Sequence, residues 1–114
     1  MPKVFFRKFL NDPMIRLDPD QLALVKKILK EQIPEWEVRA FGSRVSGKQI
    51  KPFSDLDLAV MSEEPMKISQ RAVLNEAFSE SNLTIKVDVV DWSEISENFR
   101  AQILSACEII QPKS

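Results

Sequence analysis

The 114-residue sequence predicts an α/β (α+β) fold in which helices pack mainly on one face of a mixed β-sheet. Apolar residues alternate in three short segments, as in strands: 35–41, 55–61 and 84–90. They recur at helical spacing in three longer segments: 18–33, 66–81 and 93–110. With 44% apolar residues, the chain can bury a core of one domain, which we place at 18–114 after an N-terminal arm or extension at 1–17.

The first predicted helix, 18–33, has clear signals at both ends. Asp18 is a typical N-cap, Pro19 suits the first helical position, and Gln21 stands in the reciprocal capping position. Pro34 ends the helix because proline cannot continue it. Its apolar stripe consists of Leu22, Val25, Leu29 and Ile33.

Both glycines of the chain, Gly42 and Gly47, follow the strand 35–41. Glycine allows sharp turns and close approach, and a short helix expected at 43–46 would direct backbone N–H groups at an anion. We therefore predict a phosphate-binding turn made of Gly42, Ser43, Arg44 and Gly47. The alternative is an ordinary strand-to-helix turn with Ser43 as the helix cap. Residues 48–53 should form an exposed basic loop whose Lys48 could also reach phosphates.

Asp55 and Asp57 begin the second predicted strand. Residues two apart on a strand project from the same face, so these carboxylates would point together while Leu56 and Leu58 enter the core. The chain has no histidine and one cysteine, so a metal here would have oxygen ligands, which favours Mg²⁺ or Mn²⁺ over zinc. The alternative is a turn signal at the start of the strand.

Asp88 interrupts the valine-rich strand 84–90, and beside Asp55 and Asp57 it would complete a three-carboxylate metal site. The alternative is an edge strand with a solvated outer face, which Lys86 would permit. Asp91 is expected to serve the following turn or helix cap. Cys107 is interpreted as a core residue of the last helix, since no histidine exists to activate it, and residues 111–114 as a tail.

Gly42-Ser43, a basic residue at 44, Gly47 and then Asp55-x-Asp57 followed by apolar residues resemble the signature of the nucleotidyltransferases related to DNA polymerase β. From about residue 18 to about residue 110, the chain resembles the minimal nucleotidyltransferases of bacteria and archaea, which are partners of HEPN-domain proteins. Eleven residues separate Ser43 from Asp55, one more than the commoner spacing of this group, and we assign the additional residue to the loop 48–53.

The resemblance implies the nucleotidyltransferase core fold and transfer of AMP from ATP to a hydroxyl acceptor, with release of pyrophosphate. Asp55, Asp57 and Asp88 would hold a pair of Mg²⁺ ions, or Mn²⁺, and Asp88 would also be the general base. Ser43 and the nearby amides would hold the β- and γ-phosphates. The implied acceptor is a tyrosine of a HEPN toxin, which makes the chain an antitoxin enzyme. The alternative is a non-catalytic antitoxin that blocks its partner by complex formation and retains a vestigial nucleotide site.

Charge and composition exclude several other partners. With 16 basic and 17 acidic residues the formal charge is −1, which gives no strong field for a long nucleic acid. The single cysteine excludes an internal disulfide, and no signal peptide or long apolar span is present. We therefore expect a cytoplasmic protein without a membrane partner.

Overall fold

The computed structural model describes residues 15–47 and 54–113. The loop expected at 48–53, with Lys48, and most of the predicted arm lie outside the described residues. In chain order the elements are α2 (Pro19–Gln32), β1 (Val38–Phe41), α3 (Ser43–Ser46), β2 (Leu56–Val60), α4 (Ile68–Ser79), β3 (Val87–Asp91), the 3-10 helix η1 (Trp92–Glu94), α5 (Glu97–Ser105) and β4 (Cys107–Gln111).

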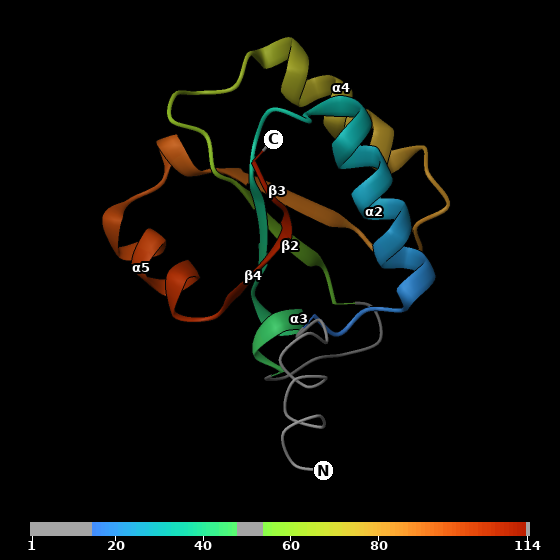
Figure 1. The fold of residues 1–114 in the computed structure, drawn as a ribbon, viewed down its shortest axis with the longest axis horizontal. Coiled ribbons are helices and arrows are strands. Elements are labelled where there is room, and N and C mark those ends of the chain that lie inside the picture. The colour runs from blue at the N-terminus through green and yellow to red at the C-terminus, as the bar shows by residue number, and fades with distance from the viewer. Residues whose placement is uncertain (1–14, 48–53, 114) are drawn as a thin grey trace.

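The described strands form one mixed sheet in the order β3-β2-β1-β4 (Figure 1). β1 is antiparallel to both β2 and β4, whereas β2 and β3 are parallel. The end of β1 therefore meets the beginnings of β2 and β3 at one end of the sheet, next to α3. We call this the α3 end of the sheet.

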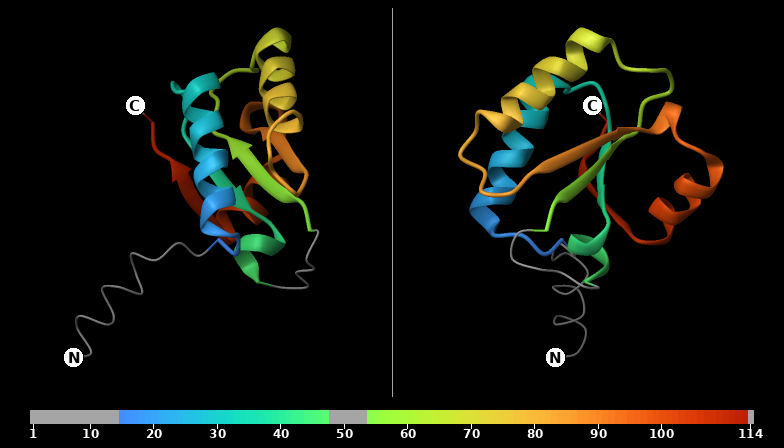
Figure 2. Two further views of the ribbon diagram at one scale, coloured as in Figure 1. Left: turned by 90° about the vertical axis from the view of Figure 1, so that its right-hand side faces the viewer. Right: turned by 180° about the vertical axis from the view of Figure 1, so that it is seen from behind.

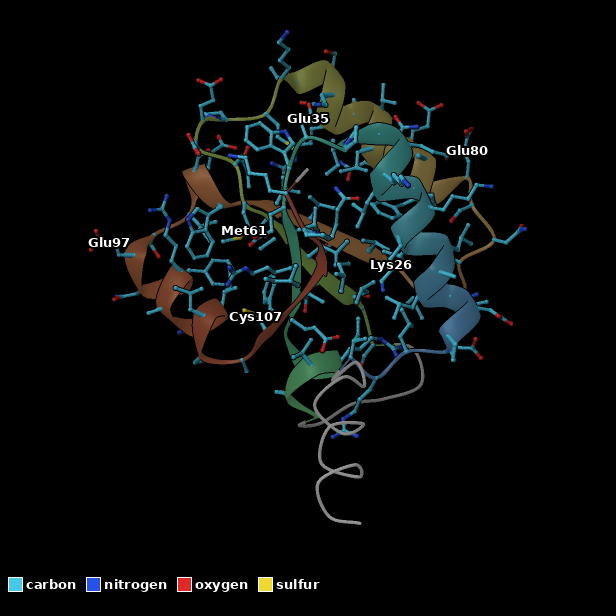
Figure 3. All side chains as sticks on the ribbon, viewed as in Figure 1. Lys26, Glu35, Met61, Glu80, Glu97 and Cys107 are labelled. Carbon is cyan, nitrogen blue, oxygen red and sulfur yellow. The ribbon has the colours of Figure 1, made fainter. Side chains whose placement is uncertain are left out.

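Helices α2 and α4 lie side by side over one face of this sheet (Figure 2). Alternate strand residues point into this layer and are fully buried: Val38, Ala40, Leu56, Leu58 and Val60. The other face carries a smaller cluster beneath α5, built around Phe41, Ala59 and Ile103. Cys107 and Met61 lie on this α5 side (Figure 3). The predicted fold class is confirmed.

The start of α2 agrees with the sequence prediction. Pro19 is its first residue, and the Asp18 carboxylate accepts a hydrogen bond from the Asp20 amide at 2.8 Å. The Gln21 side chain instead accepts hydrogen bonds from the amide and hydroxyl of Thr84, and so ties α2 to the segment before β3. Ile15, within the predicted arm, is 6% exposed and belongs to the main core. No helix among the described residues is long and apolar enough to cross a bilayer.

The helix expected over 93–110 is wrong in extent. The structure has η1, then α5 with Ser96 as its N-cap, and then a fourth strand in place of the last helical turn. The helical spacing of Ile103, Cys107 and Ile110 continues into β4, where it has no structural meaning. Tertiary context decides here, because β4 pairs the outer edge of β1, whose backbone groups would otherwise lack partners.

Gln111 and the buried face of α4 are further points of comparison with the sequence. Gln111 is not in a tail: it ends β4, is 9% exposed, and its amide donates hydrogen bonds to the carbonyls of Ile33 and Trp36 at 2.9 Å each. On α4, Leu74 and Phe78 are buried, whereas the neighbouring Val73 is 51% exposed.

Candidate functional site

A row of side chains crosses the sheet at its α3 end, on the face that α5 partly covers. Asp57 of β2 stands opposite Asp88 of the parallel strand β3 and opposite Phe41 of the antiparallel strand β1. Leu56 and Leu58 are fully buried on the other face, so strand alternation places Asp57 away from the main core. The prediction that Asp57 and Asp88 lie together is supported by this register.

Asp55 immediately precedes β2 and is partly buried. Its negative charge affects the carboxyl group of Asp57. Burial, then the negative charge of Asp88, then that of Asp55 raise the pKa of Asp57 to about 6. Like charges near one another oppose ionisation unless a cation neutralises them. Asp57 is therefore the electrostatic centre of the three carboxylates that the sequence singled out.

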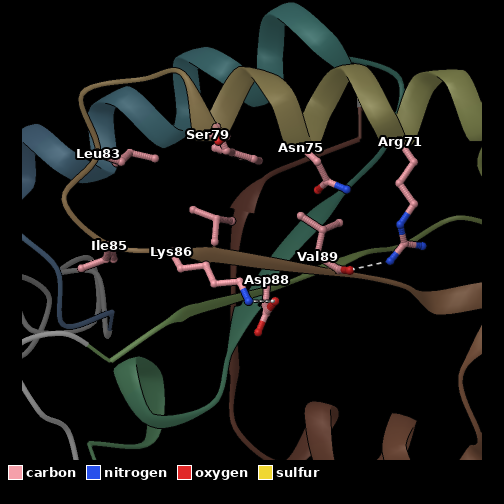
Figure 4. A pocket seen from close by; sticks show the side chains of 10 residues that line it. Arg71, Asn75, Ser79, Leu83, Ile85, Lys86, Asp88 and Val89 are labelled. Carbon is pink, nitrogen blue, oxygen red and sulfur yellow. Dashed lines mark hydrogen bonds and ion pairs between the residues drawn. The ribbon is translucent and has the colours of Figure 1, made fainter.

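Asp88 is the accessible member of the set. Its side chain is 50% exposed, and the Lys86 ammonium lies 3.8 Å from its carboxylate (Figure 4). An ion pair this exposed contributes little stability, so Lys86 does not hold Asp88 firmly. Both residues border a groove of about 520 Å³ between α4 and the β3 edge, lined in addition by Arg71, Asn75 and Phe78.

Gly42 connects the phosphate turn to the carboxylates. Its φ of 81° with ψ of −160° is a conformation that glycine alone adopts readily. A Cβ at this position would also overlap the Oδ2 atom of Asp57. The Gly42 carbonyl accepts hydrogen bonds from Val45 and Ser46, which starts α3. Glycine at 42 thus lets the turn lie directly against the central carboxylate.

Ser43 is the first residue of α3 and is partly buried next to Gly42. The N-cap of α3 is Gly42, and no side chain makes a capping hydrogen bond there. The alternative interpretation of Ser43 as the helix cap is therefore wrong. Its hydroxyl lies on the turn that contacts Asp57, which is compatible with the predicted role toward phosphate.

Arg44 has a different position from the one its motif suggested. Its side chain is 7% exposed, and its guanidinium donates hydrogen bonds to the carbonyls of Ser54 at 2.9 Å and Arg16 at 2.8 Å. These bonds tie α3 to the residue before Asp55 and to the segment before α2. The geometry favours a positioning role for Arg44 over direct contact with phosphate.

Gly47 ends α3 in the left-handed conformation, with φ of 77°, and its amide donates to the Ser43 carbonyl at 2.8 Å. A Cβ at Gly47 would come within 2.8 Å of Nε of Arg16. The Arg16 guanidinium therefore lies against the turn. Sequence reasoning missed Arg16, and no local signal could have found it, because it stands outside the motif and reaches the turn only through the fold.

Asp91 has the structural role predicted for it. Its carboxylate, 2% exposed, caps η1 by accepting hydrogen bonds from the amide and hydroxyl of Ser93 and also accepts from Ser62 and the Met66 amide. Cys107 is partly buried in the α5-side cluster, as expected for a packing residue, although on a strand. Its sulfur lies 3.7 Å from the Arg39 guanidinium.

The carboxylates provide a hard, oxygen-only donor set that suits a divalent cation such as Mg²⁺. Within 15–47 and 54–113, however, no three His, Cys, Asp or Glu side chains are already grouped to hold a metal by themselves. The Asp88 carboxylate lies instead 3.8 Å from the Lys86 ammonium. The chemistry of these oxygen donors fits a divalent cation, which Asp55, Asp57 and Asp88 would hold.

A glycine-serine turn held against aspartates on two neighbouring strands is the arrangement that the sequence predicted for a nucleotide-binding site. Comparison with protein families agrees: residues 24–114 match the family "Polymerase beta, Nucleotidyltransferase". The chain belongs to this nucleotidyltransferase family.

Individual proteins that are similar to this chain give more specific comparisons than the family does. The chain is 51% identical over 94 residues to the probable protein adenylyltransferase MntA of Haemophilus influenzae, covering 82% of each chain. It also resembles a crystal structure of a toxin-antitoxin with AMP-PNP, with a TM-score of 0.64, 27% identity, and coverage of 78% of this chain and 71% of that one. A mutant MntA–HpeT toxin-antitoxin structure matches with a TM-score of 0.61 and 26% identity, covering 82% and 71%.

Proposed function

We propose that this chain is a cytoplasmic antitoxin enzyme that transfers AMP from ATP to a tyrosine hydroxyl of a HEPN-domain toxin and releases pyrophosphate. The observation that carries the proposal is the placement of Asp57: partly buried, opposite Asp88, against Gly42, and with a pKa raised to about 6. A carboxylate in these surroundings favours a bound cation next to a phosphate-binding turn. The similarity to a probable protein adenylyltransferase supports a protein acceptor.

In this proposal Asp55, Asp57 and Asp88 would hold a pair of Mg²⁺ ions, which would supply positive charge for the reacting oxygens. The Ser43 hydroxyl and nearby amides bind the β- and γ-phosphates. The acceptor oxygen forms a bond to the α-phosphorus as the bond from that phosphorus to the β-phosphate oxygen breaks. Pyrophosphate leaves, and the hydroxyl proton passes to Asp88.

Asp88 suits the role of base because of its access to solvent. Its side chain is 50% exposed on the edge strand β3, whereas Asp57 lies between Asp88 and Phe41. An acceptor that enters along the groove between α4 and β3 would reach Asp88 first. The proton acceptor would then lie within hydrogen-bonding distance of the incoming hydroxyl, as general base catalysis requires.

The acceptor would be positioned by the partner protein. Correct orientation supplies several kcal/mol of a reaction barrier, and one small domain has little surface beyond the nucleotide site to provide it. Two similar solved structures are toxin-antitoxin structures, and one of them contains AMP-PNP. These similarities support a toxin as the protein that completes the site.

The test is transfer of label from ATP labelled at the α-phosphate, with Mg²⁺, to the co-purified HEPN partner. We expect the wild-type chain and Asp20→Asn, an exposed control on α2, to add the mass of an AMP group to a partner tyrosine. Asp88→Asn should abolish this addition. The same three proteins should be scored for protection of cells against the toxin.

The two antitoxin classes give different results in this experiment. An enzyme should lose modification and protection together in Asp88→Asn. A folded Asp88→Asn protein that protects fully, while wild type adds no label to the partner, would overturn the catalytic proposal and leave an antitoxin that acts by binding.

A further inference from the structure

Arg16 is anchored to the phosphate turn through its backbone. Its amide donates a hydrogen bond to the Arg44 carbonyl at 2.6 Å, and its carbonyl accepts one from the Arg44 guanidinium at 2.8 Å. The buried Arg44 side chain fixes this connection between the segment before α2 and α3. The position of the Arg16 Cα relative to the turn is therefore set by bonds that do not involve its own side chain.

The Arg16 side chain is exposed, yet its guanidinium lies on the turn. A Cβ placed on Gly47 would come 2.8 Å from its Nε and 2.9 Å from its Nη2. Glycine at 47 thus serves two purposes: it adopts a positive φ, and it leaves room for the flat guanidinium group. Within the described part of the chain, no carboxylate forms an ion pair with Arg16.

The location of Arg16 is relevant because, among the described residues, few cationic side chains are available to the proposed ligand at this turn. A nucleoside triphosphate is strongly anionic, and α3 itself contains a single cationic side chain, Arg44. The Arg44 guanidinium donates to two backbone carbonyls and is 7% exposed. A cationic side chain that contacts the phosphates would therefore come from residues around α3, and Arg16 is held against the same turn by the bonds described above.

We propose that the Arg16 guanidinium binds the terminal phosphates of the nucleotide, an inference that rests on the proposed function. A guanidinium presents paired N–H donors that match two phosphate oxygens, and such charge-assisted bonds are among the stronger ones in proteins. The two arginines then have different roles. Arg44 stabilises the turn through hydrogen bonds to backbone carbonyls, and Arg16 contacts the phosphates.

The test compares the affinities of the purified chain for ATP and AMP, each with MgCl₂, by calorimetry. Arg16→Ala should weaken ATP binding about fivefold to thirtyfold and AMP binding less than about twofold, because AMP lacks the terminal phosphates. Arg16→Lys should recover part of the loss. Lys26→Ala removes the same charge from α2, away from the turn (Figure 3), and should change neither affinity.

Thermal unfolding of each variant accompanies the binding measurement. If Arg16→Ala loses stability, Arg16→Gln keeps the side-chain stem over Gly47 and must show the same selective loss for ATP. Unchanged ATP affinity in folded Arg16→Ala or Arg16→Gln, or equal losses for ATP and AMP, would overturn this inference alone. Failure of the wild-type chain to bind ATP with Mg²⁺ would overturn the proposed function and this inference with it.

Discussion

Asp57 and Asp91, on neighbouring strands of one sheet, have opposite surroundings. Asp91, at the end of β3, accepts hydrogen bonds from Ser62, Ser93 and the Met66 amide. Asp57, near the start of β2, accepts none among the described residues and instead faces Asp88. Hydrogen-bond donors surround the Asp91 carboxylate, whereas other carboxylates lie near that of Asp57.

The pKa values of the two groups move in opposite directions. Burial raises the pKa of Asp91, but the hydrogen bonds from Ser62, Ser93 and Met66 outweigh it, so the pKa is lowered. Burial also raises the pKa of Asp57, and there the neighbouring charges of Asp88 and Asp55 add to it. A buried charge with donors supports the fold, whereas one beside like charges is costly unless it binds a cation. Asp91 therefore stabilises the fold, whereas Asp57 is the carboxylate that we propose binds the cation.

The largest expected effect is on catalysis. Asp57→Asn should lower the rate of AMP transfer about a thousandfold or more, since it removes the central metal-binding carboxylate. Its melting temperature should stay the same or rise, because the substitution also removes repulsion from Asp55 and Asp88. Label transfer to the partner and calorimetric unfolding measure the two quantities. A rate within about tenfold of wild type would contradict the role assigned to Asp57.

The matching change at Asp91 should affect stability instead. Asp91→Ala leaves the Ser62 hydroxyl and the Met66 amide without their buried acceptor, and should lower the free energy of unfolding by about 2–4 kcal/mol. Urea denaturation measures this loss. At a temperature where the variant is folded, its affinity for ATP with Mg²⁺ should equal that of wild type. A loss below about 0.5 kcal/mol would mean that the donors around Asp91 contribute little.

Stability should depend on pH with opposite signs at the two groups. The folded pKa of Asp57 is raised from 3.8 to about 6, so its contribution is present below about pH 4 and is lost as pH rises through 6. We expect metal-free protein to lose about 1–2 kcal/mol from Asp57 over this window, after allowance for partial exposure. The lowered pKa of Asp91 gives stability above its unfolded value that disappears as acid protonates the folded state.

Variants separate these two contributions. In urea denaturation without metal, Asp57→Asn should remove the decline between pH 4 and 6, and Asp91→Asn should reduce the loss at lower pH. Saturating Mg²⁺ with ATP should also suppress the decline due to Asp57 in wild type. A wild-type protein whose stability rises steadily from pH 4 to 6 while Asp57→Asn behaves identically would contradict the assignment.

The smallest expected effect concerns Ser43. Ser43→Ala should weaken ATP binding about threefold to tenfold, through loss of one hydrogen bond to phosphate. Stability should change by less than about 0.5 kcal/mol, because Gly42, and not Ser43, occupies the N-cap of α3. Calorimetric titration and thermal unfolding check the two values. Unchanged ATP affinity with a lower melting temperature would indicate a structural role only.

The sequence predicted those features that follow from local pattern. The alternation of Asp57 with Leu56 and Leu58 places the carboxylate on the face opposite the main core, as the burial of both leucines confirms. Gly42 was singled out because its residue type implies close approach, and the contact with Asp57 has that character. Short-range rules suffice when a strand has one apolar and one polar side.

Features that depend on contacts between residues far apart in the sequence could not be predicted from local pattern. The strand Cys107–Gln111 follows α5 after only Ala106, and its apolar residues continue the helical spacing, so the need of β1 for a second partner decides its structure. Arg44 was predicted to contact phosphate because it lies inside the glycine-serine motif. Its burial depends on the carbonyls of Arg16 and Ser54, which lie outside its own helix and could not be anticipated from local pattern. Arg16 reaches the turn for the same long-range reason.

The most direct test of the account is the metal dependence of ATP binding. Calorimetry should detect binding with MgCl₂ or MnCl₂ by wild type and by the exposed control Asp20→Asn. We expect binding to weaken about tenfold or more in EDTA, and to a similar extent in Asp57→Asn with MgCl₂, because the carboxylates then repel the phosphates instead of sharing a cation with them. Equal ATP affinity in MgCl₂ and in EDTA would contradict a metal and nucleotide site at the α3 end of the sheet.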